Sequence, residues 1–286
     1  MYKLTSLPLL KSGKVRDIYT INASRLLIVA SDRVSAFDAL LPVSIPRKGQ
    51  MINTISKFWF NFFKDDLNTQ ATTDKVDDLP LTKVERVKIR NRAVIVKNVT
   101  PIRIEAIVRG YLVGSGWAAY QKTGKVCGIT LKPGLRLAER LKSPIYTPSE
   151  KIDSGDINIT YSKTVEMVGA DLAHQIREYS LLLYSKAAKY ALAKGIIIAD
   201  VKFEFGLDHE GNLILIDELF TPDSARLWVK DTYQVGTTPD SYDKQHIRDY
   251  IASLEPDEMA KLRSLPADLI TQTTKAYTTA RDILTT

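Results

Sequence analysis

The stretch IIIADVKFEFG (Ile196–Gly206) is a strand-like run in which polar and apolar residues alternate. Asp200, Lys202 and Glu204 take every second position. Successive side chains of a strand point to opposite faces, so these three share one face. The apolar residues between them share the other face and can enter a core. The stretch therefore predicts a β-strand with one charged face and one buried face.

A turn-like stretch, LDHEGN, leads from this strand into a second run, LILIDE (Leu213–Glu218), which ends in two acids. We expect a β-hairpin whose polar face carries several carboxylates and one amine. If Asp217 faces Glu204 across the hairpin, the two can bind one Mg²⁺ with phosphate oxygens completing the shell. The alternative is a salt-bridged hairpin in which Lys202 and a downstream arginine are the counter-charges.

Length and composition point to an ordinary globular protein. The chain has 286 residues, of which 44% are hydrophobic and 26% charged, enough for a large core and two lobes. A single cysteine, Cys127, allows no internal disulfide and fits a reducing compartment. The first residues, MYKLTSLPLL, hold too short an apolar run for a signal peptide, and no stretch approaches ~18 apolar residues. We expect a soluble cytoplasmic protein without a membrane partner.

The charge balance is basic, with a net charge of +7 and a pI near 9.2. This permits nucleic-acid binding and equally suits small anionic substrates. The cations between Lys83 and Lys142 are spread among apolar residues, so we expect no nucleic-acid partner. His174, His209 and His246 are far apart and match no zinc spacing.

The first ~110 residues are expected to be rich in strands. One hairpin is predicted from Val15–Ile21 and Arg25–Ser31, and two further strands from Arg92–Val99 and Ile102–Leu112. A helix from Asn53 to about Lys64 lies between them.

The middle of the chain, from Gly124 to Pro148, is punctuated by glycine and proline and predicts an irregular segment. One long amphipathic helix is expected over Ser162–Lys194, with Gly195 as its stop. Two C-terminal helices are expected over Tyr242–Leu254 and Ala267–Leu284. The order of strands, loop, helix, hairpin and helices predicts an α+β fold.

Two N-terminal stretches carry polar groups suited to binding. SGKVRDIY (Ser12–Tyr19) sets Gly13 beside Lys14 and Arg16, so the backbone can approach a phosphate, although the pattern is no Walker A loop. Its alternative is a charged start of a hairpin. SDRVSAFD (Ser31–Asp38) mixes both charge signs with hydroxyls and suits a zwitterion or a sugar phosphate. Its alternative is a polar turn after a strand.

A third stretch, IEAIVRGYLVGSGW (Ile104–Trp117), runs from a strand into a glycine loop. Arg109 ends the strand, and Ser115 lies between two glycines. An arginine fork with a hydroxyl and free backbone amides suits a phosphate, whereas the glycines alone can be turns. TPSEK (Thr147–Lys151) is a similar polar loop, and Arg226 follows a proline turn after the acidic hairpin.

Together these stretches resemble the SAICAR synthetase family. The motifs that match in the family's order are GKVRDIY, SDRVSAFD, IPRKGQMINTIS, EAIVRGYLVGSGW, PIYTPSEK, ADVKFEFG and IDELFTPDSARLW. They span Gly13–Trp228, and the length resembles the longer, monomeric members. The family's TPSTK motif and acidic, His-containing continuation differ here, because the chain reads TPSEKIDSGDINI with Glu150 and no histidine.

The resemblance implies a two-lobed α+β fold around a central cleft. A strand-rich ATP-binding lobe would comprise residues 1–110, and a mixed α/β lobe for substrate and metal would comprise residues 111–286. It also implies a ligase of purine biosynthesis, which condenses L-aspartate with the carboxylate of CAIR, an aminoimidazole ribotide. ATP and Mg²⁺ would be the cofactors, and the enzyme would be a monomer.

The resemblance also implies roles for individual residues. The ATP site would consist of Gly13, Lys14, Val15, Arg16 and Lys97. The substrate sites would consist of Ser35, Asp38, Arg109, Ser115, Lys151 and Arg226. Glu204 and Asp217 would hold Mg²⁺, while Lys202 and Asp200 would be catalytic, near the reacting carboxylate.

The expected mechanism passes through an acyl phosphate, because an unactivated carboxylate does not react with an amine at neutral pH. Cations must offset the repulsion between the carboxylate and ATP. Either Asp200 or the phosphate takes the amine proton. A small-molecule kinase needs similar residues and is the nearest rival. A basic nucleic-acid-binding protein is the second rival, and it predicts steep salt dependence.

Overall fold

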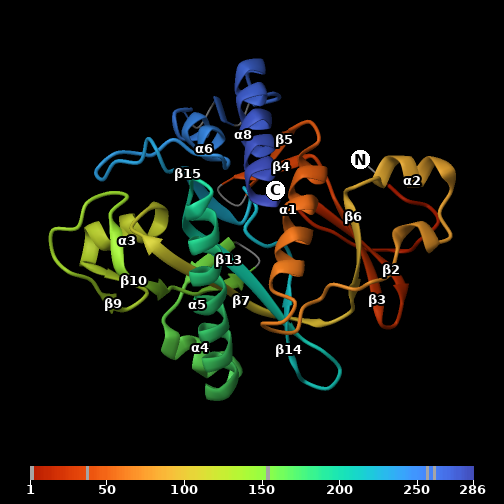
Figure 1. Ribbon diagram of the computed structural model, residues 1–286, viewed down its shortest axis with the longest axis horizontal. Coiled ribbons are helices and arrows are strands. Elements are labelled where there is room, and N and C mark those ends of the chain that lie inside the picture. The colour runs from red at the N-terminus through yellow and green to blue at the C-terminus, as the bar shows by residue number, and fades with distance from the viewer. Residues whose placement is uncertain (1–2, 37–38, 153–154, 256–257, 260–261) are drawn as a thin grey trace. The chain divides into compact units, whose positions relative to one another are not determined.

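The structure is a computed structural model that describes residues 3–36, 39–152, 155–255, 258–259 and 262–286 (Figure 1). By spatial contacts the chain divides into two compact units, which we describe one at a time. The first is Met1–Thr100 with Asp243–Thr286, and the second is Pro101–Tyr242. The expected boundary at residue 110 falls inside the second unit, and the C-terminal segment groups with the first. Which ligand each segment binds stays a prediction.

The first unit is built on a four-stranded antiparallel sheet in the order β1-β2-β3-β6. Its strands are β1 (Leu9–Ser12), β2 (Arg16–Asn22), β3 (Arg25–Ala30) and β6 (Ala93–Lys97). A separate hairpin is formed by β4 (Arg33–Ala36) and β5 (Ala39–Ser44). The predicted N-terminal hairpin is confirmed, since β2 and β3 pair from Arg16 opposite Ala30 to Asn22 opposite Arg25.

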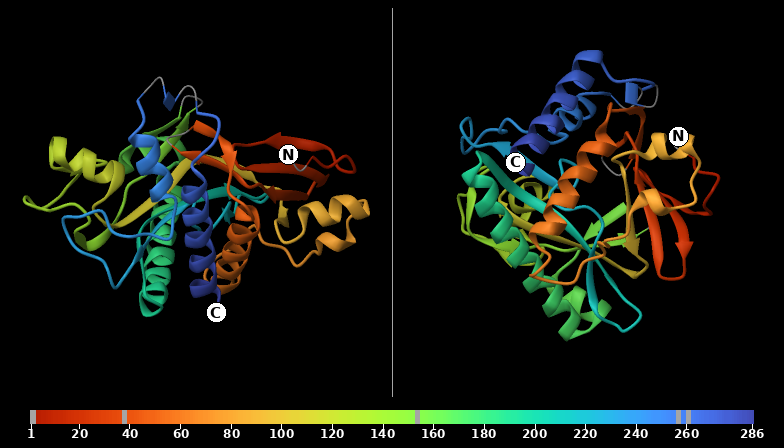
Figure 2. Two further views of the ribbon diagram at one scale, coloured as in Figure 1. Left: turned by 90° about the horizontal axis from the view of Figure 1, so that it is seen from above. Right: turned by 45° about the vertical axis from the view of Figure 1, so that its right-hand side comes forward.

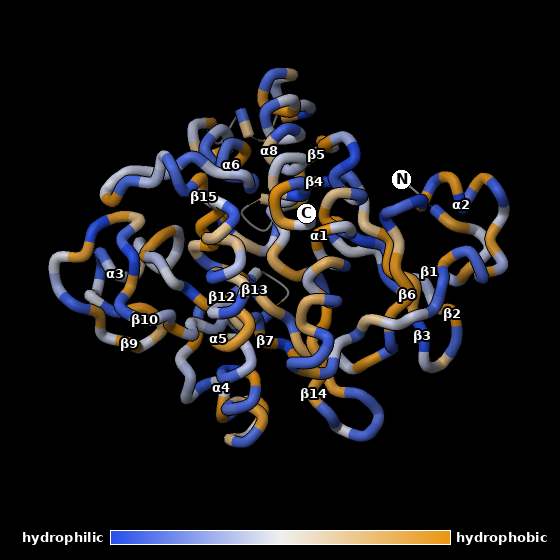
Figure 3. The backbone as a smooth tube through the Cα atoms, in the orientation of Figure 1, coloured by the Kyte–Doolittle hydropathy of each residue, from blue (hydrophilic) through white to orange (hydrophobic). Residues whose placement is uncertain are grey.

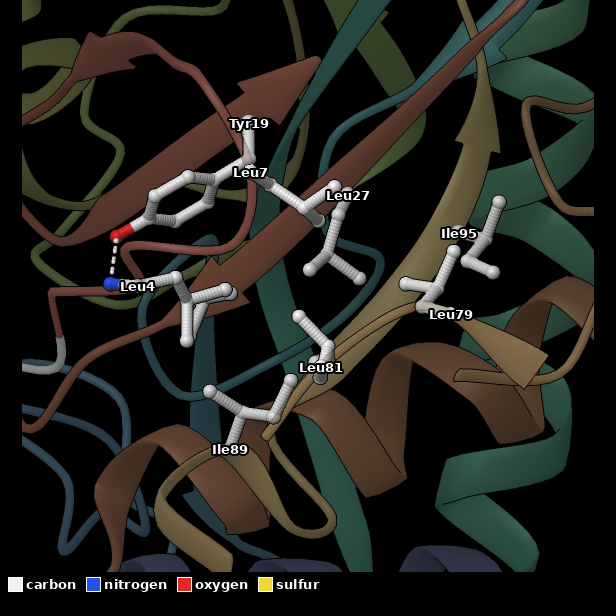
Figure 4. Close-up of a cluster of buried hydrophobic side chains, with 10 residues drawn as sticks. Leu4, Leu7, Tyr19, Leu27, Leu79, Leu81, Ile89 and Ile95 are labelled. Atoms are coloured by element: carbon white, nitrogen blue, oxygen red, sulfur yellow. Dashed lines mark hydrogen bonds between the residues drawn. The ribbon is translucent and has the colours of Figure 1, made fainter. Parts of the chain in front are cut away.

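One face of this sheet is covered by apolar side chains from neighbouring segments (Figure 4). Leu79 and Leu81 come from the segment after the short 3₁₀ helix η1 (Val76–Asp78), and Ile89 comes from α2 (Lys83–Ile89). The buried Tyr19 hydroxyl accepts a hydrogen bond from the Leu4 amide at 3.2 Å. The N-terminal residues are thereby fastened to the sheet.

The first unit contains the α-helices α1 (Lys48–Phe62), α2, α6 (Gln245–Ala252) and α8 (Ala267–Thr285) among its described residues. The two predicted C-terminal helices are thus confirmed. Figure 2 shows α1 and α8 running side by side, and Tyr277 packs against Met51 and Ile52.

Helix α1 begins five residues before the predicted Asn53 because Gly49 allows a close approach to β3. A Cβ atom at Gly49 would lie 2.4 Å from the carbonyl oxygen of Ala30. The Gly49 amide also donates to the Asp32 carboxylate at 2.9 Å, which places an anion at the N-terminus of the helix. The contacts of Gly49 with Ala30 and Asp32 leave no hydrophobic periodicity in the sequence, so the first turn of α1 was not predicted.

The second unit is built on a seven-stranded sheet with the path β12-β11-β7-β13-β14, to which β10 and β15 add by pairing with β7 and β13. Its strands are β7 (Thr100–Tyr111), β10 (Arg140–Tyr146), β11 (Ser149–Ile152), β12 (Gly155–Asn158), β13 (Ile196–Leu207), β14 (Leu213–Ile216) and β15 (Ala225–Val229). A small hairpin is formed by β8 (Lys125–Val126) and β9 (Ile129–Thr130). The mixture of helices and sheets in the two units confirms the predicted α+β class.

The helices of this unit are α3 (Gly114–Thr123), α4 (Tyr161–Val168) and α5 (Ala170–Ala193), of which α5 packs on β13 (Figure 1). The single helix predicted over Ser162–Lys194 is wrong at one point, because the chain breaks at Gly169. That residue has φ +84°, a left-handed value that interrupts the helix without steric cost at glycine. Apolar residues recur at helical spacing on both sides of Gly169, so the sequence pattern does not indicate the break.

The predicted acidic hairpin is confirmed, with β13 and β14 antiparallel from Glu204 opposite Ile216 to Leu207 opposite Leu213. Figure 3 shows a hydrophilic loop next to the hydrophobic β14. The strand β10 was not expected within the proline- and glycine-rich middle segment. Among the described residues, no helix has the length and apolar character needed to cross a membrane.

Candidate functional site

The two faces of β13 differ as the alternation predicts. The buried apolar face consists of Val201, Phe203 and Phe205, none more than 1% exposed. On the other face Asp200 is buried, whereas Lys202 and Glu204 are half-buried. This charged face meets β7, β11 and β15, each of which supplies further charged side chains.

Two arginines converge on Asp200, and we call Arg109, Asp200 and Arg226 the arginine cluster. Arg109 Nη1 donates to Asp200 Oδ2 at 2.9 Å, and Arg226 Nη1 donates to the same oxygen at 2.6 Å. Arg109 also donates through Nε to Thr147 Oγ1 at 3.0 Å and through Nη2 to Ser115 Oγ at 2.9 Å. The register of β13 and β15 places Arg226 directly opposite Asp200.

The arginine cluster is largely buried and has a net positive charge, because it contains two guanidinium groups and one carboxylate. Arg109 is 2% exposed. Burial lowers the pKa of Arg109, Asp200 opposes this effect, and Arg226 adds to it as a like charge. One carboxylate shared by two guanidinium groups leaves a surplus cation, which favours a bound anion.

The glycine loop at the start of α3 makes room for both arginines. A Cβ atom at Gly114, where φ is +57°, would lie 2.4 Å from Arg226 Nη2. A Cβ atom at Gly116 would lie 3.0 Å from Arg109 Cδ. The glycines of GSG therefore do more than turn the chain, because they let two guanidinium groups lie against the helix N-terminus beside Ser115.

A second group of charges, which we call the lysine–glutamate cluster, consists of Glu105, Lys151, Lys202 and Glu204. Lys202 Nζ donates to Glu105 Oε1 at 2.6 Å and to Glu204 Oε1 at 3.0 Å. Lys151 Nζ pairs with the other oxygen of Glu204 at 2.6 Å. Two cations alternate with two anions, so this cluster is balanced.

The lysine–glutamate cluster strongly favours the charged forms of its members. Burial alone would lower the pKa of Lys202, but Glu204 and Glu105 outweigh it and hold that pKa far above its usual value. Burial likewise would raise the pKa of Glu204, but Lys202 and Lys151 outweigh it and hold that pKa far below its usual value. Lys202 is therefore a fixed cation at neutral pH.

Lys151 makes this contact from the stretch that departs from the family motif. It lies in β11, which pairs with β12 so that Lys151 is opposite Asp156. Glu150, the residue that replaces the family's threonine, is opposite Ile157. On either side of residues 153–154, which lie outside the described part of the chain, the two strands pair in register, and Lys151 reaches Glu204.

Asp217 lies beyond the end of β14 and is half-buried, with φ +69°. The strand register places Ile216, not Asp217, opposite Glu204, so the expected facing pair of acids is not formed by the ladder itself. Carboxylate oxygens are the donors that Mg²⁺ prefers, and both residues supply them, so the donor set fits the ion chemically. The metal role of Glu204 and Asp217 stays a prediction.

The predicted ATP residues lie in the first unit. The Gly13 amide donates to the Arg16 carbonyl at 2.8 Å, which closes a tight turn with Lys14 and Val15 at its tip. Lys14 is exposed there. Lys97 is the last residue of β6. A cation at the tip of a tight turn fits the predicted phosphate contact.

Two charged residues of the SDRVSAFD stretch form ion pairs within the first unit. Asp32 pairs with Arg92 at 2.8 Å, and Arg33 pairs with Asp17 at 2.9 Å. Ser35 lies in β4, and its carbonyl oxygen accepts from Lys244 Nζ at 3.1 Å. Asp38 lies outside the described residues.

The structure thus places the substrate and catalytic residues predicted between Arg109 and Arg226 in two groups: Arg109, Ser115, Asp200 and Arg226 bond to one another, and Lys151 and Lys202 both bond to Glu204. Two members were missed. Glu105 lies on the same face of β7 as Arg109, four residues away, and this even spacing within a strand was the available signal. Thr147 lies in the TPSEK stretch, but its bond to Arg109 was not predicted, because the two residues are distant in the sequence.

Comparison with known proteins gives a consistent result. Residues 9–277 match the SAICAR synthetase family. The phosphoribosylaminoimidazole-succinocarboxamide synthase of Thioalkalivibrio sulfidiphilus is 51% identical, over 96% of this chain and 93% of that protein. The enzyme of the same name from Haemophilus influenzae is 49% identical, over 99% of this chain and 98% of that protein.

Among solved structures, the SAICAR synthase of Saccharomyces cerevisiae in complex with SAICAR superposes with a TM-score of 0.89. It is 40% identical to this chain, and the match covers 98% of this chain and 95% of that one. The matches span both compact units and every motif named above. The chain therefore belongs to the SAICAR synthetase family.

Proposed function

We propose that this chain is an ATP-dependent ligase that joins L-aspartate to the carboxylate of CAIR and releases SAICAR, ADP and phosphate in purine biosynthesis. Membership of the family supports this activity. The observation that carries it in the structure is the arginine cluster, where two guanidinium groups share the single carboxylate of Asp200. The surplus positive charge beside Ser115 suits a substrate that carries a phosphate.

In this proposal Arg109, Ser115 and Arg226 hold the ribotide phosphate. Asp200 acts as a positioning residue, because its Oδ2 atom receives both arginines and fixes the angle between them. The helix N-terminus of α3 adds backbone amides to the same place. A dianionic phosphate would restore the charge balance that the cluster lacks.

The chemistry would proceed in two displacements. A carboxylate oxygen of CAIR attacks the γ-phosphorus of ATP, and the bond to the β-phosphate oxygen breaks to release ADP. The aspartate amine then attacks the acyl carbon, the carbon–oxygen bond breaks, and phosphate leaves with the amine proton. Lys202, held as a cation by Glu105 and Glu204, lowers the repulsion between anions in the first step.

Magnesium would be held by Glu204 and Asp217 with phosphate oxygens as further donors. The bound ion would offset the negative charge of the phosphates. Since Lys151 and Lys202 both bond to Glu204, at least one of these contacts would loosen when the carboxylate takes a metal.

ATP would bind in the first unit. The turn of Gly13, Lys14, Val15 and Arg16 would cover its phosphates, and Lys97 would lie near the adenine. Ser35 and Asp38 would serve the CAIR and aspartate pockets. The enzyme would work as a monomer in the cytoplasm. Its single cysteine allows no internal disulfide, which fits a reducing compartment.

An ADP-release assay tests the proposed function. The purified protein is incubated with ATP, Mg²⁺, CAIR and L-aspartate, and each is omitted in turn while ADP and SAICAR are quantified. Equal amounts of ADP and SAICAR, formed only when all components are present, are the expected result. ADP release that follows a hydroxyl acceptor and ignores aspartate would instead identify a kinase and reject the ligase.

A further inference from the structure

A pocket of about 320 Å³ lies in the second unit, between α5 and the strands β7, β10 and β13. Arg109 and Gly110 are consecutive in β7, so they face opposite sides of the sheet. Gly110 lines this pocket, whereas Arg109 belongs to the arginine cluster. Arg109, Asp200 and Arg226 are not among its lining residues, so the pocket is distinct from the arginine cluster, although β7 contributes to both.

The back of the pocket is made by a close contact between Gly110 and Tyr184. A Cβ atom at Gly110 would lie 1.8 Å from the Tyr184 hydroxyl. That hydroxyl donates to the Ile198 carbonyl oxygen at 2.7 Å, so Tyr184 is fixed and its donor is used. The Tyr184 hydroxyl is thus occupied as a donor, and polar recognition in the pocket comes from other side chains.

Those side chains are cations. Arg140, Lys142 and Lys189 line the pocket, and no acidic residue is among its lining residues. In the part of the chain that the structure describes, none of the three forms a salt bridge. Arg140 also acts on Tyr111 in the pocket wall: burial raises the pKa of Tyr111, and the positive charge of Arg140 lowers it.

The remaining lining is mostly apolar and includes Leu141, Leu192 and Ile197, with Ser185 as one further polar side chain. Two tyrosine side chains, Tyr111 and Tyr184, complete it. An apolar chamber with a cationic rim selects a ligand with an apolar body and an anionic end. The volume lies at the lower end of the ~300–1,000 Å³ typical of ligand pockets, which limits the occupant to a small molecule.

We propose that this pocket is a second binding site, for a small monophosphate ester that carries a flat apolar ring. The ring would lie against the tyrosine and leucine side chains, and the phosphate would contact Arg140, Lys142 and Lys189. A phosphate fits better than a neutral group because three cations face it without acidic partners. The site would bind its ligand whether or not the chain is turning over substrate.

Isothermal titration with phenyl phosphate tests the site, because this probe has the predicted ring and the predicted charge. The wild-type protein is compared with Arg140→Glu and Lys189→Glu. Each substitution removes a cation and adds a like charge to the phosphate, so we expect the dissociation constant to rise at least ~10-fold. Lys186→Glu is the matched control, since it makes the same charge change on α5 without lining the pocket. It should bind like the wild type.

Two further titrations locate the binding. Arg226→Lys alters the arginine cluster, which by the proposed function can itself take a phosphate, so this variant should leave in place the binding event that Arg140→Glu and Lys189→Glu weaken. Inorganic phosphate should bind at least ~10-fold more weakly than phenyl phosphate, because it forgoes the apolar contacts. The proposal is overturned if the two pocket variants bind like the wild type, if Arg226→Lys alone loses binding, or if inorganic phosphate binds equally well. Binding is the readout throughout, so loss of the proposed ligase activity would not affect the result.

Discussion

The arginine cluster and the lysine–glutamate cluster are both built around charged residues of β13, yet they balance charge differently. In the first, two guanidinium groups share one carboxylate. In the second, two ammonium groups alternate with two carboxylates. The unbalanced cluster is prepared for an anion from outside, whereas the balanced one holds an ammonium group in a fixed position. The difference teaches that neighbouring charge clusters can differ in net charge, and the proposed roles, anion binding for one and support of the chemistry for the other, follow that difference.

The largest effect is expected from Lys202→Ala in the balanced cluster. Loss of one well-placed electrostatic donor typically lowers the rate ~10²–10³-fold, and we expect kcat for SAICAR formation to fall by that much. The circular dichroism spectrum should be retained, and Lys186→Ala should match the wild type. Turnover near the normal rate would remove Lys202 from the proposed chemistry.

A somewhat smaller effect, about 10²-fold in kcat, is expected from Asp217→Asn. Asparagine tolerates the left-handed backbone at this position, so the substitution removes charge without disturbing the fold. The rate should recover partly as the Mg²⁺ concentration is raised. A Mg²⁺ titration that superposes on that of the wild type would contradict the metal role.

A pair of glycine substitutions sharpens the comparison at the unbalanced cluster. Gly114 and Gly124 both have left-handed backbones, so alanine strains each by about 1–2 kcal/mol. Only Gly114→Ala also drives a methyl group into Arg226, because nothing lies within 4 Å of the corresponding position at Gly124. We expect the KM for CAIR to rise ~10-fold in Gly114→Ala alone, since a misplaced charged contact weakens binding by about that factor.

Similar losses of thermal stability in the two glycine variants would show that the backbone strain is matched. If the KM for CAIR changed equally in both, the approach of Arg226 to the loop would have no part in binding.

The smallest effect is on stability and comes from Glu204→Gln. The pKa of Glu204 lies below its ordinary value of 4.5, so its contribution is present above that pH and is lost as the pH falls through the lowered pKa. The variant should be less stable than the wild type by about 1–3 kcal/mol near neutral pH. Urea unfolding at a series of pH values should show this difference shrinking in acid. A difference that persists unchanged in acid would mean that the ion pairs are not its source.

Much of the site was predictable from the sequence because its residues lie on strands with a strict period of two. Asp200, Lys202 and Glu204 were placed on one face by spacing alone, and the comparisons confirm the family that the neighbouring motifs indicated. Contacts between distant segments were not predictable in this way. The pairing of Glu105 with Lys202 joins residues 97 positions apart, and no local pattern encodes it.

The fold shows the same division between local and distant information. The strands β2, β3, β13 and β14 followed from alternation and turn residues. The early start of α1 depends on the approach of Gly49 to Ala30, and the break at Gly169 interrupts an apolar period that continues beyond it. The register that sets Ile216 opposite Glu204 depends on the length of the hairpin loop, which composition does not determine.

The order of segments in the chain has a consequence for biosynthesis. The unit Pro101–Tyr242 is continuous, whereas the other unit needs Asp243–Thr286, the part of this sequence that leaves the ribosome last. Tyr277 is needed to bury Ala30, Met51 and Ile52. The apolar residues of α6 and α8 are likewise needed to bury Val34, Leu41 and Ile45. The continuous unit can fold during translation, while the segment before Pro101 keeps apolar surface exposed until Asp243–Thr286 has been made. A nascent chain that stalls before α8 would therefore be a substrate for chaperones because of its oldest residues, not its newest.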